Sequence, residues 1–264
     1  MGDVTPRAEI RFVAIGDSFT EGVGDDLPGG TPGDRVRGWA DLAAQGLADA
    51  TGRPIQYANL AIRGRLLGPI IDEQLEPALA LQPTLVSFNG GGNDMLRPGT
   101  DIPWIVSRTE SALTRILDAG AQPLLLAGAN PTVGIPRGES VQAKGDQLAA
   151  AAAELAERLG ILMCDNWSDP LLARREFWSS DRLHLAPVGH HRVAVNVLRT
   201  LGHEPPADWI IDADPLPKPN LRAELRYTRQ HVLPWIRRRL TGRSSGDGRS
   251  AKFPEWQWIE PRAS

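Results

Sequence analysis

The chain has 264 residues, 41% hydrophobic and 23% charged, a balance typical of a globular protein that buries its own core. Its net charge of −3 gives no basis for binding nucleic acid, and it has neither a signal-peptide pattern nor an apolar run long enough to span a membrane. The single cysteine, Cys164, excludes an intramolecular disulfide bond, and these features together favour a reducing, cytoplasmic location.

Short apolar runs alternate with longer segments of helical spacing over residues 1–204. The predicted strands cover residues 10–15, 54–59, 84–88, 123–127 and 161–164. The predicted helices cover residues 39–50, 66–81, 102–119, 144–159 and 187–201. Strands that alternate with helices in this way predict a central five-stranded parallel sheet between two layers of helices.

Two segments depart from this alternation. Residues 21–38 are rich in Gly, Pro and Asp and are predicted to form a loop that is long enough to have a function. Residues 205–264 hold 11 Lys and Arg against 7 Asp and Glu, together with four of the 8 tryptophans. We therefore expect a main domain over 1–204 and a basic, Trp-rich extension over 205–264 that packs on this domain or on a partner.

Polar or small residues with chemical potential follow several of the predicted strands. Ser18 follows the first strand, Gly64 follows the second, and Asn93 follows the third. The loop after the fifth strand leads to Asp181 and His184. Because ligands of parallel α/β sheets bind at the carboxyl ends of the strands, we expect these residues at one edge of the sheet.

Ser18, Asp181 and His184 suit nucleophilic catalysis. A serine hydroxyl is a weak nucleophile and needs a neutral histidine, oriented by a carboxylate, to accept its proton. The spacing of Asp181 and His184 lets the carboxylate fold back onto one ring nitrogen while the other nitrogen faces Ser18. The alternative is that Asp181 caps the helix that follows and that His184 is a surface residue.

The sequence NGGGND at 89–94 suits the stabilisation of an oxyanion. Glycine lets backbone N–H groups approach a ligand closely, and Asn93 carries a side-chain amide that can donate. The backbone N–H groups of Ser18 and Gly64 are further candidate donors. The alternative is that the glycines only close a turn and that Asn93 caps a helix.

Together these segments resemble the SGNH hydrolases, also called the GDSL family. The matching residues are Gly16-Asp17-Ser18, Asn59 to Gly64, Gly91-Gly92-Asn93-Asp94 and Asp181-Arg182-Leu183-His184, with Phe19 where the family usually has leucine. The resemblance covers roughly residues 8–202, which makes 1–204 the catalytic domain, and it implies a flavodoxin-like three-layer α/β/α sandwich. It also implies that Ser18 is the nucleophile, His184 the base and Asp181 its orienting carboxylate. Ser18, Gly64 and Asn93 are then the oxyanion hole.

Four other residues are candidates for contacting a substrate. Arg63 and Arg65 flank Gly64, where they either meet an anionic group or face solvent. Trp39 and Trp178 flank the predicted loops, where they either line an acyl or sugar pocket or pack in the core. No set of His, Cys, Asp and Glu has the spacing of a metal site, and the expected chemistry needs no metal or cofactor.

The C-terminal extension contains two distinctive segments. Residues 221–240 form a basic amphipathic pattern, which either lies on an anionic membrane surface or packs its apolar face on the main domain. The sequence FPEWQWIEP at 253–261 is predicted to dock its aromatic side chains in a groove, either over the active site or at a dimer contact.

These features favour a serine esterase that hydrolyses carboxylic esters through an acyl intermediate on Ser18. The first alternative is acyl transfer from a donor such as acyl-CoA to a sugar or other alcohol at the same site, with arginines meeting the phosphates of the donor. The second alternative is a membrane- or partner-binding module whose site is inactive. The expected partners are accordingly a small-molecule ester or acyl donor.

Overall fold

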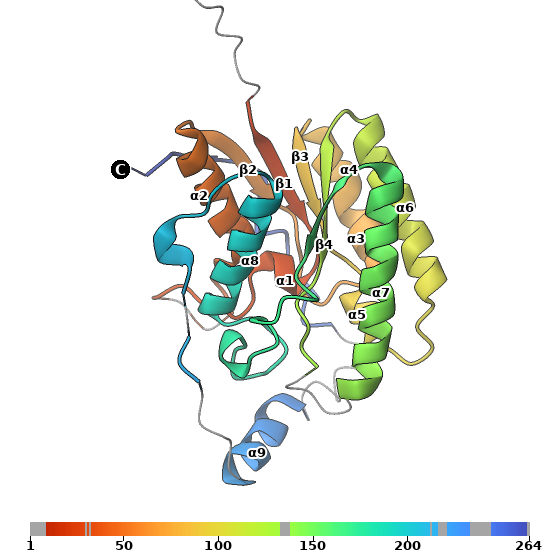
Figure 1. Cartoon of the computed structure of the whole chain (residues 1–264), viewed down its shortest axis with the longest axis vertical. Coiled ribbons are helices and arrows are strands. Elements are labelled where there is room, and N and C mark those ends of the chain that lie inside the picture. Colours follow the sequence, from red (N-terminus) through yellow and green to blue (C-terminus); the bar gives the residue numbers. More distant parts are fainter. Residues whose placement is uncertain are drawn as a thin grey trace, which may run out of the picture.

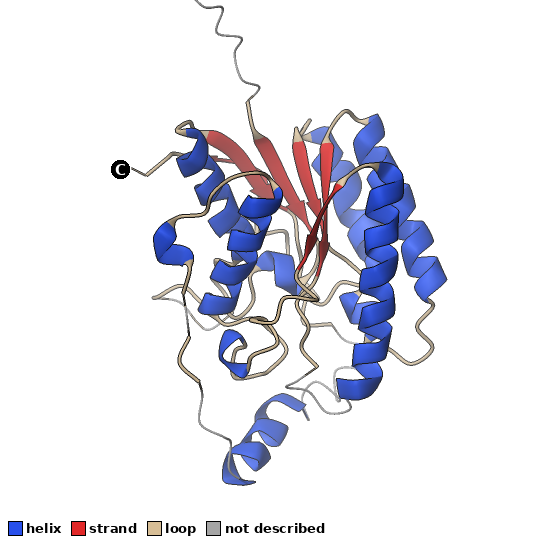
Figure 2. Cartoon of the chain, in the orientation of Figure 1, coloured by secondary structure: helices blue, strands red, loops and turns tan. Residues whose placement is uncertain are grey.

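One mixed sheet of six strands forms the centre of the molecule (Figures 1 and 2). The computed structural model describes residues 9–29, 31, 33–132, 138–211, 213–215, 221–232 and 244–262. The strands are β1 Arg11–Ile15, β2 Ile55–Asn59, β3 Leu85–Phe88, β4 Gln122–Ala127, β5 Leu162–Asp165 and β6 Phe253–Ile259. Their order across the sheet is β5-β4-β3-β1-β2-β6, and the first five strands are parallel, as predicted.

Helices cover both faces of the sheet and complete the predicted three-layer α/β/α sandwich (Figure 2). The α-helices are α1 Ser18–Glu21, α2 Trp39–Thr51, α3 Leu67–Ile70, α4 Glu76–Ala80, α5 Gly92–Met95, α6 Ile102–Asp118, α7 Gly138–Leu159, α8 Pro187–Thr200 and α9 Leu221–Tyr227. The other helical turns are the π-turns η1 Ile71–Leu75 and η4 Thr228–Val232 and the 3₁₀-turns η2 Arg175–Phe177 and η3 Ala207–Trp209. Helices α2 and α8 lie on one face, and α3, α4, α6 and α7 lie on the other (Figure 1).

Alternate residues of strand β1 belong to the two core clusters on opposite faces of the sheet. Phe12 and Ala14 belong to the core cluster beneath α2 and α8, whereas Val13 and Ile15 belong to the cluster beneath α3, α6 and α7. Successive side chains of a strand point to opposite faces, so a strand that is covered on both sides must be apolar throughout. This explains why the five parallel strands are recognisable from the sequence as short apolar runs.

The helix predicted over 66–81 is interrupted. It consists of α3, the wider π-turn η1 and α4, and Pro77 lies in the first turn of α4. Proline has no N–H to donate and its ring crowds the preceding turn, which favours a local departure from α-helical hydrogen bonding. The short helices α1 and α5 were not predicted, because each consists of the motif residues that follow a strand.

The sixth strand corrects the prediction for residues 253–261. Strand β6 pairs antiparallel with β2, with Gln56 opposite Trp258 and Asn59 opposite Phe253. The aromatic segment therefore adds a strand to the edge of the sheet and does not dock in a groove over the active site. The sheet has six strands where five were predicted, and the sixth strand comes from the 205–264 extension.

Part of the basic segment at 221–240 falls within the described residues. In α9, the ring of Tyr227 lies 3.9 Å from the guanidinium carbon of Arg182, so this helix contacts the loop that carries Asp181 and His184. Residues 233–240 of the segment lie outside the described residues. Among the described helices, none has both the length and the apolar character needed to cross a membrane.

Candidate active site

A tight turn at the carboxyl end of β1 presents Ser18. The Asp17 side chain caps the N-terminus of α1, where its Oδ1 accepts the Phe19 N–H at 3.0 Å. Gly16 has no room for a side chain, because a Cβ there would lie 2.6 Å from Oγ1 of Thr20. Ser18 is therefore the first residue of a helix, and its hydroxyl and its backbone N–H stand at the same end of α1.

Gln74 holds this turn from the opposite side. Its Oε1 accepts the Gly16 N–H at 2.8 Å, and its Nε2 donates to the Gly16 carbonyl at 2.9 Å. Gln74 is buried in the π-turn η1, which follows β2 in the chain. Sequence reasoning missed this residue, since a glutamine inside a predicted helix carries no local signal of such a contact.

The Asp181 and His184 side chains are paired as the sequence predicts. His184 Nδ1 lies 2.6 Å from Asp181 Oδ2, and Asp181 Oδ1 accepts the backbone N–H groups of Leu183 and His184 and the hydroxyl of Ser179. Burial opposes ionisation of Asp181, but these hydrogen bonds outweigh it and hold the pKa of this carboxyl well below its usual range. Asp181 is therefore ionised and fixes His184 with its Nδ1–H toward the carboxylate, which leaves Nε2 free to accept a proton.

Ser18, Asn93 and His184 line one pocket of about 150 Å³. Its apolar lining comes mainly from β3, β4, α6 and α7 and includes Phe88, Ile105, Leu125, Leu126, Leu148, Ala149 and Ala152. Trp178 lines the same pocket and donates its Nε1–H to the Leu172 carbonyl at 2.8 Å. A reactive polar end joined to an apolar interior is the arrangement expected for a site that holds an acyl group.

Asn93 connects two of the predicted site segments. Its Nδ2 donates to Asp17 Oδ2 at 3.1 Å and to the Arg65 carbonyl at 2.9 Å. The turn that carries Gly64 therefore lies beside the residue that precedes Ser18. Burial raises the pKa of Asp17 to about 6, and the Phe19 N–H and His184 partly offset this effect.

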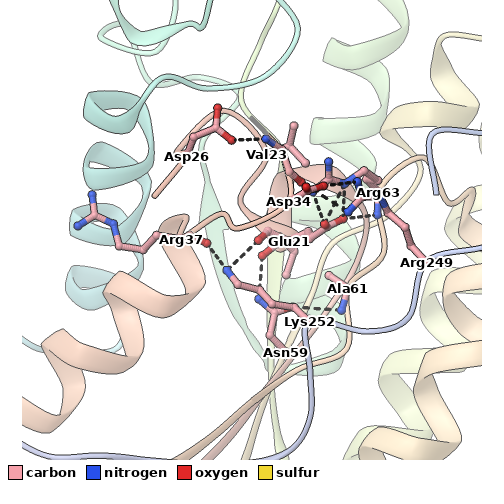
Figure 3. Close-up of polar contacts among 12 residues, drawn as sticks. Glu21, Val23, Asp26, Asp34, Arg37, Asn59, Ala61, Arg63, Arg249 and Lys252 are labelled. Atoms are coloured by element: carbon pink, nitrogen blue, oxygen red, sulfur yellow. Dashed lines mark hydrogen bonds and ion pairs between the residues drawn. The ribbon is translucent and has the colours of Figure 1, made fainter. Parts of the chain in front are cut away.

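The other predicted substrate contacts lie elsewhere. Arg63 is buried and paired with Glu21: its Nε lies 2.8 Å from Glu21 Oε1, and its backbone N–H donates to Oε2 at 2.6 Å (Figure 3). Arg65 pairs with Glu73 at 2.9 Å. Trp39, the first residue of α2, is fully buried in the core cluster shared with α8, and it is not among the residues that line the pocket.

Cys164 and His190 are buried and are not among the residues that line the pocket. Burial raises the pKa of the Cys164 thiol to about 12, which makes it a protonated core residue. His190 is completely buried, accepts the Trp39 N–H at Nδ1 and lies 3.2 Å from the Val23 carbonyl at Nε2. Among the described residues, no group of His, Cys, Asp and Glu is arranged to hold a metal ion.

Comparison with known proteins identifies a family and a set of similar folds. Residues 14–192 match the model of the GDSL-like lipase/acylhydrolase family. The crystal structure of TesA aligns with a TM-score of 0.59 and 24% identity over 72% of this chain and 97% of that chain. Axe2, an acetylxylan esterase from Geobacillus stearothermophilus, aligns with a TM-score of 0.61 and 21% identity over 77% of this chain and 97% of that chain.

The psychrotrophic esterase EstA from Pseudoalteromonas sp. aligns with a TM-score of 0.57 and 17% identity over 74% of this chain and 97% of that chain. A search of curated proteins finds no significant match. At these identities, the structural neighbours establish the shared fold, and the family match rests on residues that include every predicted site position.

Proposed function

Since the chain belongs to the GDSL-like lipase/acylhydrolase family, a family of ester-hydrolysing enzymes, we propose that it hydrolyses carboxylic esters through an acyl intermediate on Ser18. The observation that carries this proposal is the pairing of His184 with an ionised Asp181 at 2.6 Å, in a loop whose histidine lines the same pocket as Ser18. A neutral histidine in this tautomer is the base that a serine nucleophile requires.

The first half of the reaction acylates Ser18. Its oxygen attacks the ester carbonyl carbon while His184 Nε2 takes the hydroxyl proton, and the ionised Asp181 stabilises the resulting imidazolium. The tetrahedral intermediate collapses when His184 returns the proton to the departing alcohol. In the second half, His184 deprotonates a water molecule that attacks the acyl carbon and releases the acid and free Ser18.

The negative oxygen of the intermediate needs preorganised donors. The backbone N–H of Ser18 stands at the N-terminus of α1, and the N–H of Gly64 lies in the turn that Asn93 contacts. The side-chain NH₂ group of Asn93 has two N–H donors, and they bind Asp17 Oδ2 and the Arg65 carbonyl. To act as the third donor to the oxyanion, Asn93 exchanges one of these two hydrogen bonds for a bond to the negative oxygen.

The apolar pocket sets the substrate class that we propose. An apolar cavity of roughly 150 Å³ accommodates a benzene-sized molecule, which corresponds to an acyl chain of about six carbons. We therefore expect esters of medium-length aliphatic acids to react faster than acetate esters. Acyl transfer to an alcohol uses the same intermediate, so it is a second outcome of the same assay.

The experiment compares p-nitrophenyl acetate, hexanoate and dodecanoate as substrates of the wild type and of Ser18→Ala. We expect the highest kcat/KM with the hexanoate and a loss of roughly 10³-fold or more in Ser18→Ala. A burst followed by slow turnover that an added sugar accelerates indicates acyl transfer. Equal rates for the wild type and Ser18→Ala with all three esters would refute the proposal.

A further inference from the structure

A C-terminal segment lies behind the two turns that carry Ser18 and Gly64. We call residues 244–252 the strap; it precedes β6, and its Arg249 and Lys252 contact the 21–38 loop (Figure 3). At one end, Ser244 Oγ donates to the Gly64 carbonyl at 3.2 Å. At the other end, Lys252 reaches into a buried polar cluster, and between them Arg249 lies 3.6 Å from Asp34.

Lys252 is a mostly buried cation, and all three of its N–H donors have acceptors. Its side chain is only 11% exposed. The ammonium donates to the Glu21 carbonyl at 3.0 Å and to the Arg37 carbonyl (Figure 3). It also donates to Asp41 Oδ2 at 2.7 Å. An ammonium has three N–H donors, so each has one acceptor in this arrangement.

The Glu21 carbonyl belongs to the helix that begins with Ser18. The last carbonyls of a helix have no partner within the helix, and α1 has only four residues. Lys252 binds the Glu21 carbonyl, and Asn59 Nδ2 binds the Thr20 carbonyl at 3.0 Å. The C-terminal end of α1 is therefore held from outside, as Asp17 holds its N-terminal end.

Glu21 also connects α1 to the turn of Gly64. Its carboxylate accepts the backbone N–H of Arg63 as well as the guanidinium. The strap packs on the other side of this turn so closely that a Cβ on Gly246 would lie 2.1 Å from the Arg63 carbonyl. A Cβ on Gly64 would in turn lie 2.3 Å from Ser244 Oγ.

We infer that Lys252 is a positioning residue for the oxyanion hole. This inference rests on the proposed esterase function. By binding the Glu21 carbonyl, Lys252 fixes the distance between the N–H of Ser18 and the N–H of Gly64, since Glu21 belongs to α1 and its carboxylate holds the turn that leads to Gly64. Misplacement of catalytic groups by about 1 Å can cost on the order of 10²-fold in rate.

We expect the polar cluster around Lys252 to contribute more to the positions of its members than to the stability of the fold. Asp41 Oδ1 accepts the hydroxyl of Tyr57 at 2.8 Å, and this hydroxyl accepts Asn59 Nδ2 at 3.0 Å. Buried ion pairs contribute little net stability, because the loss of hydration offsets their attraction. A closed network of this kind instead restricts each member to one position.

The test compares Lys252→Met with Arg249→Met, a matched loss of a cation from the same strap whose carboxylate partner, Asp34, is exposed. Hydrolysis of p-nitrophenyl hexanoate and the rate of Ser18 labelling by a fluorophosphonate are measured at a temperature where thermal unfolding shows both variants to be folded. We expect Lys252→Met to lower kcat and the labelling rate at least tenfold with less than about a twofold change in KM. Arg249→Met is expected to retain the wild-type values.

A folded Lys252→Met variant with wild-type kcat, or one in which only KM changes, would overturn the inference. If Lys252→Met does not fold, Lys252→Gln retains a shorter neutral donor and provides the same measurement. Failure of both variants to fold would assign Lys252 to folding and would also overturn the inference. A wild type without Ser18-dependent hydrolysis or labelling marks the distinct case in which the proposed function itself has failed.

Discussion

Replacing His190 by glutamine is expected to make the free energy of unfolding less dependent on pH. Burial lowers the pKa of His190 to about 4 from an ordinary value of 6.5, although the Val23 carbonyl and the nearby Asp25 favour its charged form. Between these two values the unfolded state binds a proton that the folded state does not bind. The folded state therefore loses stability as the pH falls from 6.5 to about 4.

The size of this effect follows from the two pKa values. Between about pH 8 and about pH 4.5, they give a loss of about 2.5 kcal/mol in the free energy of unfolding. At about pH 8, His190→Gln costs the protein about 1–3 kcal/mol for each hydrogen bond that it leaves unmade, to Trp39 or to Val23. At about pH 4.5 the same substitution is expected to cost about 2.5 kcal/mol less.

Urea unfolding of the wild type and the variant at both pH values measures this difference. Val193→Ala is a matched control, because Val193 is also fully buried in α8 and has no titratable group. Its cost is expected to be the same at both pH values. An equal cost of His190→Gln at the two pH values would refute the argument that burial keeps this histidine neutral.

Three further predictions concern the site. Arg63→Met is expected to lower the free energy of unfolding by about 3–5 kcal/mol, because it leaves the Glu21 carboxylate buried without its cation. A rise in KM without a loss of stability would instead make Arg63 a substrate contact. Ala152→Phe fills the apolar pocket and is expected to lower kcat/KM for the hexanoate ester about tenfold relative to the acetate ester, whereas Ala153→Phe on the exposed face of α7 leaves this ratio unchanged. Asp181→Asn is expected to lower kcat by roughly 10⁴-fold with little change in KM, and retention of wild-type kcat would remove Asp181 from the mechanism.

The parallel part of the fold was predictable because its signals are local. Each of the five parallel strands is a short apolar run, and helices such as α2 end at a glycine, Gly52, in the left-handed conformation. Strand β6 carries a weaker signal, since edge strands are only half covered and Pro254 interrupts the pattern. Its partner β2 ends 194 positions earlier in the chain, at Asn59 against Phe253, and no local pattern specifies such a pairing.

The candidate site likewise contains residues that local sequence patterns predict and residues that they do not. Ser18, Asn93, Asp181 and His184 fall in short motifs that follow strands, so local sequence patterns are enough to place them at one edge of the sheet. The residues that hold these motifs in place come from distant segments. Lys252 looks like an ordinary surface lysine beside a glycine-rich stretch, and its role becomes visible only when β6 brings it against α1.

The burial of Asp17, beside the proposed nucleophile Ser18, has an effect on the pH dependence of stability that is opposite in sign to that of His190. A folded-state pKa of about 6 against an ordinary value of 3.8 means that the ionised Asp17 destabilises the fold above pH 6 and that this cost disappears as the pH falls. Between about pH 8 and about pH 4.5, the fold regains about 2 kcal/mol from Asp17 while it loses about 2.5 kcal/mol from His190. The two contributions nearly cancel in the wild type. Because Asp17 titrates equally in the wild type and in His190→Gln, the difference between them isolates His190.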